Sequence, residues 1–316
     1  MNGEMVRRQF LRMAGCGLVL SPSLRAQATT PNSAGTESPK LKAPANACDC
    51  HIHIYDPARF PLAPSPRAVP ADAAVPDYRL LQKRLGNTRV VIVTPRNYAT
   101  DNRATVDAVA QLGKTVSRGV AVLSPAVTDG ELRRLDDAGV RGIRFSLNDP
   151  ATAVVTPDMI EPLSQRVADL GWHIQIFVDG DQIVELAPLL RRLPSQIVFD
   201  HLAHPPLMAG IGHASHGIVR DLIDKGRAWV KLSGAYLNSK IGAPSYPEAT
   251  RIAQAFVRAA PERLVWGSDW PHPTAAPDNK PDDAVLFDLL SVWAPVEATR
   301  YRILVENPAF LYGFGR

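Results

Sequence analysis

Short apolar runs alternate with longer amphipathic segments from residue 47 to the end of the chain. The runs have the length and composition of buried strands, and the segments between them have the three-to-four-residue spacing of helices. The expected strands are Cys48–Tyr55, Arg89–Thr94, Gly119–Leu123, Val140–Leu147, His173–Val178, Ile197–His201, Trp229–Leu232 and Leu264–Ser268. The last expected helix spans Val296–Leu304.

Eight strand–helix repeats within about 270 residues predict a parallel sheet closed into a barrel. The competing architecture is an open, doubly wound sheet, which often carries a glycine-rich nucleotide loop. No G-x-G-x-x-G sequence follows the first expected strand. We therefore expect an α/β protein with one distorted (β/α)8 TIM-like barrel over residues 47–316 and functional residues at the carboxyl ends of its strands.

The first 28 residues differ from the rest of the chain. Arg7 and Arg8 precede a weakly apolar stretch, and the sequence AQA follows, ending at Ala28. These features predict a twin-arginine signal peptide over residues 1–28, recognised by the twin-arginine export machinery, and a periplasmic mature protein. Residues 29–46 are rich in Thr, Ser, Pro and Ala, which predicts a flexible linker.

Charge and hydropathy narrow the possible partners. The chain carries a net charge of +4, and four arginines against Glu4 place +3 of it within residues 1–28. The remainder is close to neutral and has no basic stripe with interleaved aromatic residues, so we expect no nucleic-acid partner. Because no apolar run approaches the roughly 20 residues of a membrane span, we expect no stable membrane insertion of the mature protein.

Two histidines of the first strand are the main candidates for chemistry. His51 and His53 are two residues apart, and alternation along a strand places both on one face. The opposite face, against a hydrophobic layer, is expected to hold Cys48, Cys50, Ile52 and Ile54. Adjacent imidazoles can bind a metal or polarise a carbonyl group. The alternative is a hydrogen-bonded polar pair without chemistry.

Other polar residues end or follow the expected strands. They are Arg96, Tyr98, Arg144, Gln175, Asp200, His201, Lys231 and Asp269. Collecting so many ionisable groups at one end of a barrel is costly unless they serve a site. Two of them have structural alternatives. Asp200, on the opposite face to His201, is expected to cap a helix or orient a loop, and Lys231 is a candidate ion-pair partner of Asp269.

This arrangement resembles the amidohydrolase superfamily, which has an H-x-H pair on strand one, a histidine on strand six and an aspartate on strand eight. The sequences CDCHIHIYD, GIRF, FDH, KLSG and GSDWPH are similar to the branch containing 2-pyrone-4,6-dicarboxylate hydrolase, sugar lactonases and lactone isomerases. The resemblance covers the chain from about residue 47 onward. It implies a hydrolase that opens a carboxylated lactone.

The resemblance also implies roles for individual residues. Asp269 would be the general base, while His51, His53 and His201 would polarise the lactone carbonyl. The residues expected to bind the carboxylates and the ring are Tyr55, Arg96, Tyr98, Arg144 and Gln175. Arg144 and Gln175 stand where metal-binding relatives have a bridging lysine and a histidine, and the lactonase branch works without a metal. We therefore expect no metal cofactor.

Three alternatives remain at this point. One zinc ion bound by His51, His53, His201 and Asp269 would suit a decarboxylase or hydratase of the same superfamily. A lactone isomerase would use the same residues, with a substrate hydroxyl group in place of water. A solute-binding protein without catalysis is disfavoured, because it would have no need for both the histidine pair and Asp269.

Overall fold

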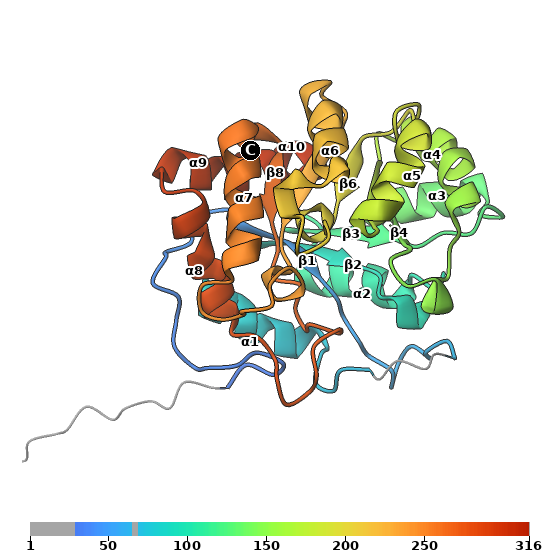
Figure 1. Ribbon diagram of the computed structural model, residues 1–316. Helices are drawn as coiled ribbons and strands as arrows, with labels where there is room; N and C mark the ends of the chain where they lie inside the picture. Colours follow the sequence, from blue (N-terminus) through green and yellow to red (C-terminus); the bar gives the residue numbers. More distant parts are fainter. Residues whose placement is uncertain (1–28, 65–68, 316) are drawn as a thin grey trace, which may run out of the picture.

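The computed structural model describes residues 29–64 and 69–315, so the expected signal peptide lies outside the described residues. Eight parallel strands follow one another in chain order, and each is hydrogen-bonded to the next (Figure 1). They are β1 (Cys48–Ile52), β2 (Arg89–Val93), β3 (Ser117–Ala121), β4 (Val140–Ser146), β5 (His173–Phe177), β6 (Ile197–Phe199), β7 (Ala228–Leu232) and β8 (Leu264–Trp266). The expected TIM-like barrel is confirmed.

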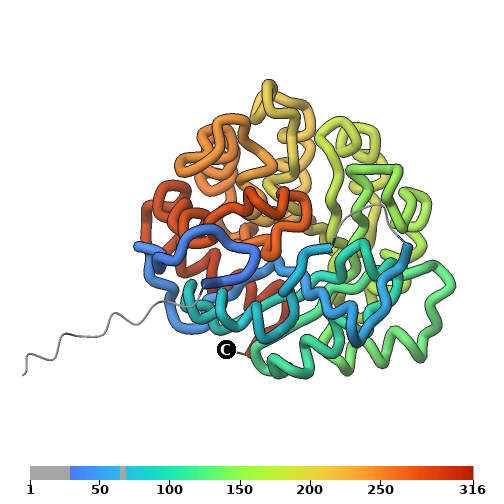
Figure 2. Tube along the Cα trace, turned by 90° about the horizontal axis from the view of Figure 1, so that it is seen from below, coloured from blue at the N-terminus to red at the C-terminus, as the bar shows by residue number. Residues whose placement is uncertain are grey.

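Helices return the chain between strands and surround the barrel, so the colours in Figure 2 progress around a ring. They are α1 (Val75–Leu85), α2 (Arg103–Leu112), α3 (Asp129–Asp137), α4 (Ile160–Ala168), α5 (Gly180–Leu190), α6 (Ala214–Asp224), α7 (Pro247–Ala259), α8 (Asp283–Trp293), α9 (Glu297–Tyr301) and α10 (Asn307–Tyr312). The expected Val296–Leu304 helix is interrupted, because a π-helical turn, Arg302–Glu306, follows α9. Of the helices described, none is both long and apolar enough to cross a membrane.

Two buried clusters stabilise the barrel. The larger contains Ile52 and Ile54 together with residues of the surrounding helices. The smaller fills the barrel interior, where Cys48 and Cys50 meet valines of other strands and Tyr312. The expectation that the cysteines share a face with the isoleucines is therefore wrong. A register irregularity between Asp49 and Ile52 interrupts the alternation, as a β-bulge does.

The barrel closes between β8 and β1 by an unusual seam. Within the described residues no ladder joins these two strands, and a single parallel bridge pairs Ile52 with Trp270. The backbone N–H of Asp269 donates to the His51 carbonyl at 2.8 Å, and that of His53 donates to the Trp270 carbonyl at 2.8 Å. The segment that follows β8 therefore completes the barrel, and this is the distortion from regular closure.

Residues 29–46 contain no helix or strand and pack along the outside of the barrel. Leu41 N–H donates to Asp288 of α8 at 2.8 Å, and Arg84 of α1 donates to the Glu37 carbonyl at 2.8 Å. The indole of Trp270 donates to the Pro31 carbonyl at 2.8 Å. The segment expected as a free linker therefore contacts both helices and the closing seam in this structure.

Candidate active site

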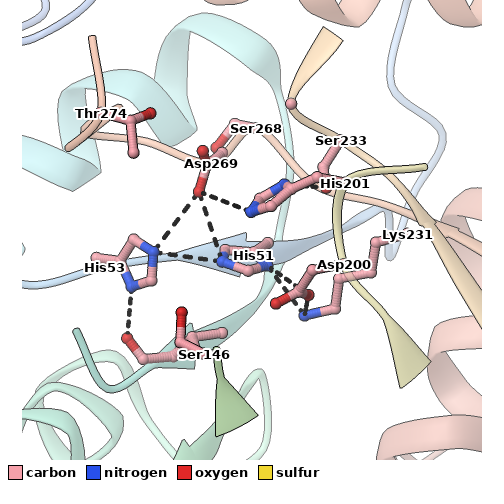
Figure 3. Close-up of polar contacts among 12 residues, drawn as sticks. His51, His53, Ser146, Asp200, His201, Lys231, Ser233, Ser268, Asp269 and Thr274 are labelled. Carbon is pink, nitrogen blue, oxygen red and sulfur yellow. Dashed lines mark hydrogen bonds and ion pairs between the residues drawn. The ribbon is translucent and has the colours of Figure 1, made fainter. Parts of the chain in front are cut away.

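Three imidazoles and one carboxylate meet at the carboxyl ends of the strands (Figure 3). One oxygen of Asp269, Oδ1, lies 3.5 Å from His51 Nε2, 3.6 Å from His53 Nε2 and 3.9 Å from His201 Nε2. All four side chains are buried. The structure therefore brings together the four residues for which the sequence predicts catalytic roles.

The closing seam positions Asp269 against the histidines. Asp269 has a φ of 68°, a left-handed conformation that is uncommon for a residue with a side chain. Gly267 lets the two segments approach, because a Cβ at this position would lie 2.6 Å from the Cβ of His51. The sequence G-S-D thus supplies a close backbone approach and then a turn that directs the carboxylate inward.

His201 is positioned by a strained turn after β6. The residues His201 to His204 all have positive φ values, between 39° and 61°. Such conformations cost of order 1–3 kcal/mol each and cluster at functional sites. The ring is held by Ser233, whose Oγ lies 3.0 Å from Nδ1, and by Phe177, which packs edge-on with 4.7 Å between ring centroids.

A buried polar layer lies beneath the histidines, inside the barrel. Asp200 Oδ2 accepts hydrogen bonds from Arg144 Nε at 2.9 Å and Gln175 Nε2 at 3.0 Å. Lys231 Nζ donates to Gln175 Oε1 at 2.8 Å and to His51 Nδ1 at 3.2 Å. Two expectations are corrected here. The Asp200 side chain binds interior cations and makes no capping hydrogen bond to the helical turn His201–Ala203 that follows it. Lys231 contacts Asp200 and His51 instead of Asp269.

Burial and neighbouring charges set the protonation of the cluster. Burial lowers the pKa of His201 to about 4 and holds the pKa of His51 well below its ordinary value. Both rings are therefore neutral at pH 7. For Asp269, burial alone would raise the pKa, but attraction to the three histidines outweighs it and holds the pKa well below its usual range. An ionised carboxylate thus faces the neutral rings of His51 and His201.

The second oxygen of Asp269 has its own partner. Tyr236 donates its hydroxyl to Asp269 Oδ2 at 2.6 Å. The Tyr236 ring packs edge-on against His272, with 5.3 Å between centroids. Sequence reasoning assigned Tyr236 no role. Its only signal was its position four residues after the end of the seventh expected strand.

A cleft of about 540 Å³, open to solvent, leads to this cluster. Of the residues with predicted roles, its walls include His53, Tyr55, Arg96, Arg144, His201 and Asp269. The lining also includes residues to which sequence reasoning assigned no role, among them Ser146, Asn148, Phe177, Leu237 and Thr274. The cleft therefore combines two guanidinium groups with apolar walls and a reactive end.

Three residues with predicted roles lie behind this lining. Tyr98 is buried behind Tyr55, and its hydroxyl accepts the backbone N–H of Asp56 at 2.8 Å. Gln175 is fully buried in the polar layer below the cleft. His51 likewise lies below the walls, with its Nε2 3.5 Å from Asp269. The expected direct contacts of Tyr98 and Gln175 with a ligand have no counterpart in this arrangement.

The distances in the cluster would admit a metal ion. Ligand atoms of His51, His201 and Asp269 lie within 4.8 Å of one another, and among the described residues this is the group with such spacing. Imidazole nitrogens and a carboxylate oxygen are the ligands that a catalytic zinc ion uses. The donor types and their spacing therefore meet the geometric requirements of one zinc ion.

The profile of the amidohydrolase family matches residues 48–314, and the chain belongs to this family. It is 36% identical over 275 residues to a 4-sulfomuconolactone hydrolase from Rhizobium radiobacter, covering 85% of this chain and 91% of that protein. It is 33% identical over 288 residues to a 2-pyrone-4,6-dicarboxylate hydrolase from Comamonas testosteroni, covering 88% and 94%. An apo crystal structure of an Agrobacterium tumefaciens protein has a TM-score of 0.79 at 31% identity, covering 88% of this chain and 99% of that one.

Proposed function

We propose that this protein is a lactonase that hydrolyses a cyclic ester bearing an anionic group, and that it works without a metal. The observation that carries the proposal is the convergence of Asp269 Oδ1 and three imidazole nitrogens within 4 Å, at the end of a cleft lined by two arginines. The names of the two similar hydrolases, a sulfomuconolactone hydrolase and a pyrone-dicarboxylate hydrolase, support an anionic cyclic ester.

The reaction begins with water in contact with Asp269. The carboxylate takes a proton from water while the water oxygen forms a bond to the lactone carbonyl carbon, which is general-base catalysis. Neutral His51 and His201 donate hydrogen bonds to the carbonyl oxygen, where negative charge develops. The ring C–O bond then breaks, and Asp269 returns its proton to the departing ring oxygen. The product is an open-chain hydroxy acid.

The role proposed for His53 differs from the expected one, which was to polarise the lactone carbonyl. Its Nδ1 lies 2.8 Å from the Val93 carbonyl, which can only accept a hydrogen bond. Nδ1 therefore carries a proton, and in a singly protonated ring Nε2 presents a lone pair toward Asp269 and His51. We propose that His53 accepts a hydrogen bond from the attacking water, while the other two rings face the carbonyl.

Two arginines would bind the anionic group of the substrate. Arg96 is oriented by Ser146 Oγ, 2.8 Å from its Nε, by Thr152 Oγ1, 2.7 Å from a terminal nitrogen, and by Asn148. Arg144 lies over the Phe177 ring, with its guanidinium carbon 5.6 Å from the centroid. Guanidinium groups fixed in this way suit bidentate recognition of carboxylates or sulfonates.

The zinc-dependent alternative has one observation in its favour, the spacing of the donor atoms. A zinc ion would be held by His51, His53, His201 and Asp269, and it would act as a Lewis acid on the substrate carbonyl. Elemental analysis of purified protein and turnover with and without a chelator separate the two proposals. Stoichiometric zinc with chelator-sensitive turnover would establish the metal enzyme.

The test of the proposed function is a panel of carboxylated and sulfonated lactones assayed with purified mature protein. We expect ring opening that survives chelation, and a fall of about 10²–10⁴-fold in Asp269→Asn, because the general base is lost. The same substitution at the exposed Asp278 is the matched control and should leave turnover intact. Near-normal turnover in Asp269→Asn would remove the proposed base. An isomeric lactone as the product would identify an isomerase, and binding without turnover a solute-binding protein.

We also propose that the protein is exported to the periplasm by the twin-arginine route, on the strength of Arg7, Arg8 and the AQA sequence ending at Ala28. Replacing both arginines by lysine should retain full-length protein in the cytoplasm, because this route reads the arginine pair itself. Cell fractionation with immunodetection measures the effect. Unchanged periplasmic protein in the double variant would contradict it.

A further inference from the structure

Lys231 is a buried cation that the proposed chemistry does not use. It lies on β7 with 0% exposure, and its amino group lies beside His51 and Asp200 (Figure 3). Its Nζ contacts Gln175 Oε1 at 2.8 Å, His51 Nδ1 at 3.2 Å and Asp200 Oδ1 at 3.6 Å. An ammonium group is costly to bury, so its contact with a histidine of the site calls for an explanation.

The hydrogen bonds around Lys231 form a chain with one direction. The Val93 carbonyl accepts from His53 Nδ1, which leaves a lone pair on His53 Nε2. His51 Nε2 lies 3.3 Å from His53 Nε2. Because His53 Nε2 offers a lone pair there, His51 Nε2 must carry the proton of the His51 ring. His51 Nδ1 is then an acceptor, and the group within reach that can only donate is Lys231 Nζ.

The opposite arrangement, in which His51 carries its proton on Nδ1 and donates it to Asp200, is less consistent with the structure. Asp200 Oδ1 lies 3.3 Å from His51 Nδ1, but it makes no hydrogen bond. If Nδ1 donated to Asp200, the lone pairs of His51 Nε2 and His53 Nε2 would face each other at 3.3 Å. That pattern, a carboxylate behind a histidine whose other nitrogen is unprotonated, is what a metal ion would require.

The charge balance around His51 also favours a site without a metal ion. Asp49 accepts the backbone N–H of His51, and burial raises the pKa of this carboxyl group to about 7. Apart from Asp49, the buried charged side chains around the His51 ring are two cations, Arg144 and Lys231, and two carboxylates, Asp200 and Asp269. Their charges cancel without any further ion. A divalent cation would add two uncompensated charges in a region where burial strengthens repulsion.

We propose that Lys231 is a positioning residue that fixes His51 with its proton on Nε2. The Nε2–H of His51 donates to His53 Nε2 in the free protein. It becomes available to the reacting carbonyl when the attacking water donates to His53 instead, and Nε2 has no lone pair for a metal ion. The catalytic consequence rests on the proposed lactonase function, but the direction of the hydrogen-bond chain does not. The chain can therefore be tested without a substrate.

The first experiment is ¹⁵N NMR of histidine-labelled protein, with the His51 signals assigned by their loss in His51→Gln. We expect Nε2 of His51 to have the chemical shift of a protonated ring nitrogen and Nδ1 that of an unprotonated one. A protonated Nδ1 in the metal-free protein would overturn the proposal. This readout needs neither activity nor a variant of Lys231.

The second experiment measures zinc binding by calorimetry in the wild type and two variants. Lys231→Met removes both charge and donor, whereas Lys231→Gln keeps an N–H donor without the charge. Zinc should bind at least about tenfold more tightly to Lys231→Met, by analogy with the effect of groups behind metal ligands, and the His51 proton should move to Nδ1. Lys231→Gln should keep the His51 proton on Nε2. Equal zinc affinities with an unchanged His51 spectrum would contradict the proposal.

Circular dichroism establishes that each variant is folded. If Lys231→Met does not fold, the wild-type spectrum and Lys231→Gln decide the question. The two proposals fail separately. Protein with the expected His51 signals that opens no lactone would contradict the lactonase, while turnover with a protonated His51 Nδ1 would contradict only the role of Lys231.

Discussion

At the scale of single residues, Tyr236 determines how Asp269 presents its two oxygens. The Tyr236 hydroxyl donates a hydrogen bond to Asp269 Oδ2 at 2.6 Å, so the other oxygen, Oδ1, faces the histidines. In the proposed mechanism, the oxygen that takes the proton from water is therefore Oδ1. A carboxylate without this hydrogen bond would rotate and present its oxygens in several orientations.

Tyr236→Phe removes this hydrogen bond and keeps the ring that packs on His272. A hydrogen bond to a charged group contributes about 1.5–3 kcal/mol, so we expect kcat to fall by about tenfold or more while KM changes little. Steady-state kinetics on a turned-over lactone measures both. The matched control is Tyr301→Phe, at a partly exposed tyrosine of α9, which should behave as wild type. A rise in KM alone would show that Tyr236 contacts the substrate instead.

At the scale of elements, the sequence predicts the strands well and their irregularities poorly. Alternation along β1 correctly places His51 and His53 side by side, with their Nε2 atoms 3.3 Å apart. It misplaces Cys48 and Cys50, because a bulge depends on the register with β2, which a single strand does not encode. The interior position of Lys231 could be anticipated from its strand, but its partner could not, since pairing across a barrel depends on three-dimensional stagger.

The left-handed turn after β6 could not be predicted from the sequence either. Four successive residues, His201 to His204, adopt positive φ values without a glycine among them. Local preference opposes this conformation, so only the surrounding structure imposes it. The expected strand Ile197–His201 therefore places His201 at the correct end of the barrel, but the strand pattern does not predict that its ring faces His51.

Asp49 links β1 to the segment that closes the barrel. Its Oδ1 accepts the backbone N–H of Ser268 at 2.9 Å and of His51 at 3.2 Å, while burial raises its pKa to about 7. Asp49→Ala leaves both buried donors without a partner. We expect its free energy of unfolding to fall by about 2 kcal/mol or more, with a lower kcat because the seam carries His51 and Asp269.

Asp49→Asn is the matched variant, since its amide oxygen can still accept both hydrogen bonds and its shape is that of the protonated acid. We expect it to lose much less stability than Asp49→Ala. Urea unfolding curves and kcat of the two variants give the comparison. Similar losses in both would show that the charge of Asp49, and not its acceptor oxygen, stabilises the seam.

At the scale of the whole molecule, a histidine in the barrel interior makes the fold sensitive to acid. Burial lowers the pKa of His173 to about 3, both of its ring nitrogens lack hydrogen-bond partners, and its ring packs against Tyr312. An unfolded chain binds a proton at this position near pH 6.5, whereas the folded chain does so only near pH 3. Stability contributed by the neutral ring is therefore lost as pH falls from about 6.5 to 3.

His173→Met should remove this sensitivity, because an apolar side chain has no proton to bind. We expect its melting temperature to fall less steeply than that of the wild type between pH 6.5 and pH 4. Thermal unfolding followed by circular dichroism at several pH values measures the slopes. Parallel slopes would assign the acid sensitivity to other groups, among them His216 on α6, whose pKa burial also lowers.

The Asp269–His51 backbone hydrogen bond joins the last part of the barrel to the first. During translation, His51 is synthesised long before Asp269. A nascent chain therefore contains the first imidazoles of the site before it contains the carboxylate. Only a finished and fully wrapped polypeptide has a working reactive centre. Fragments and half-folded chains would accordingly be inert toward cyclic esters, and catalytic competence would report that folding is complete.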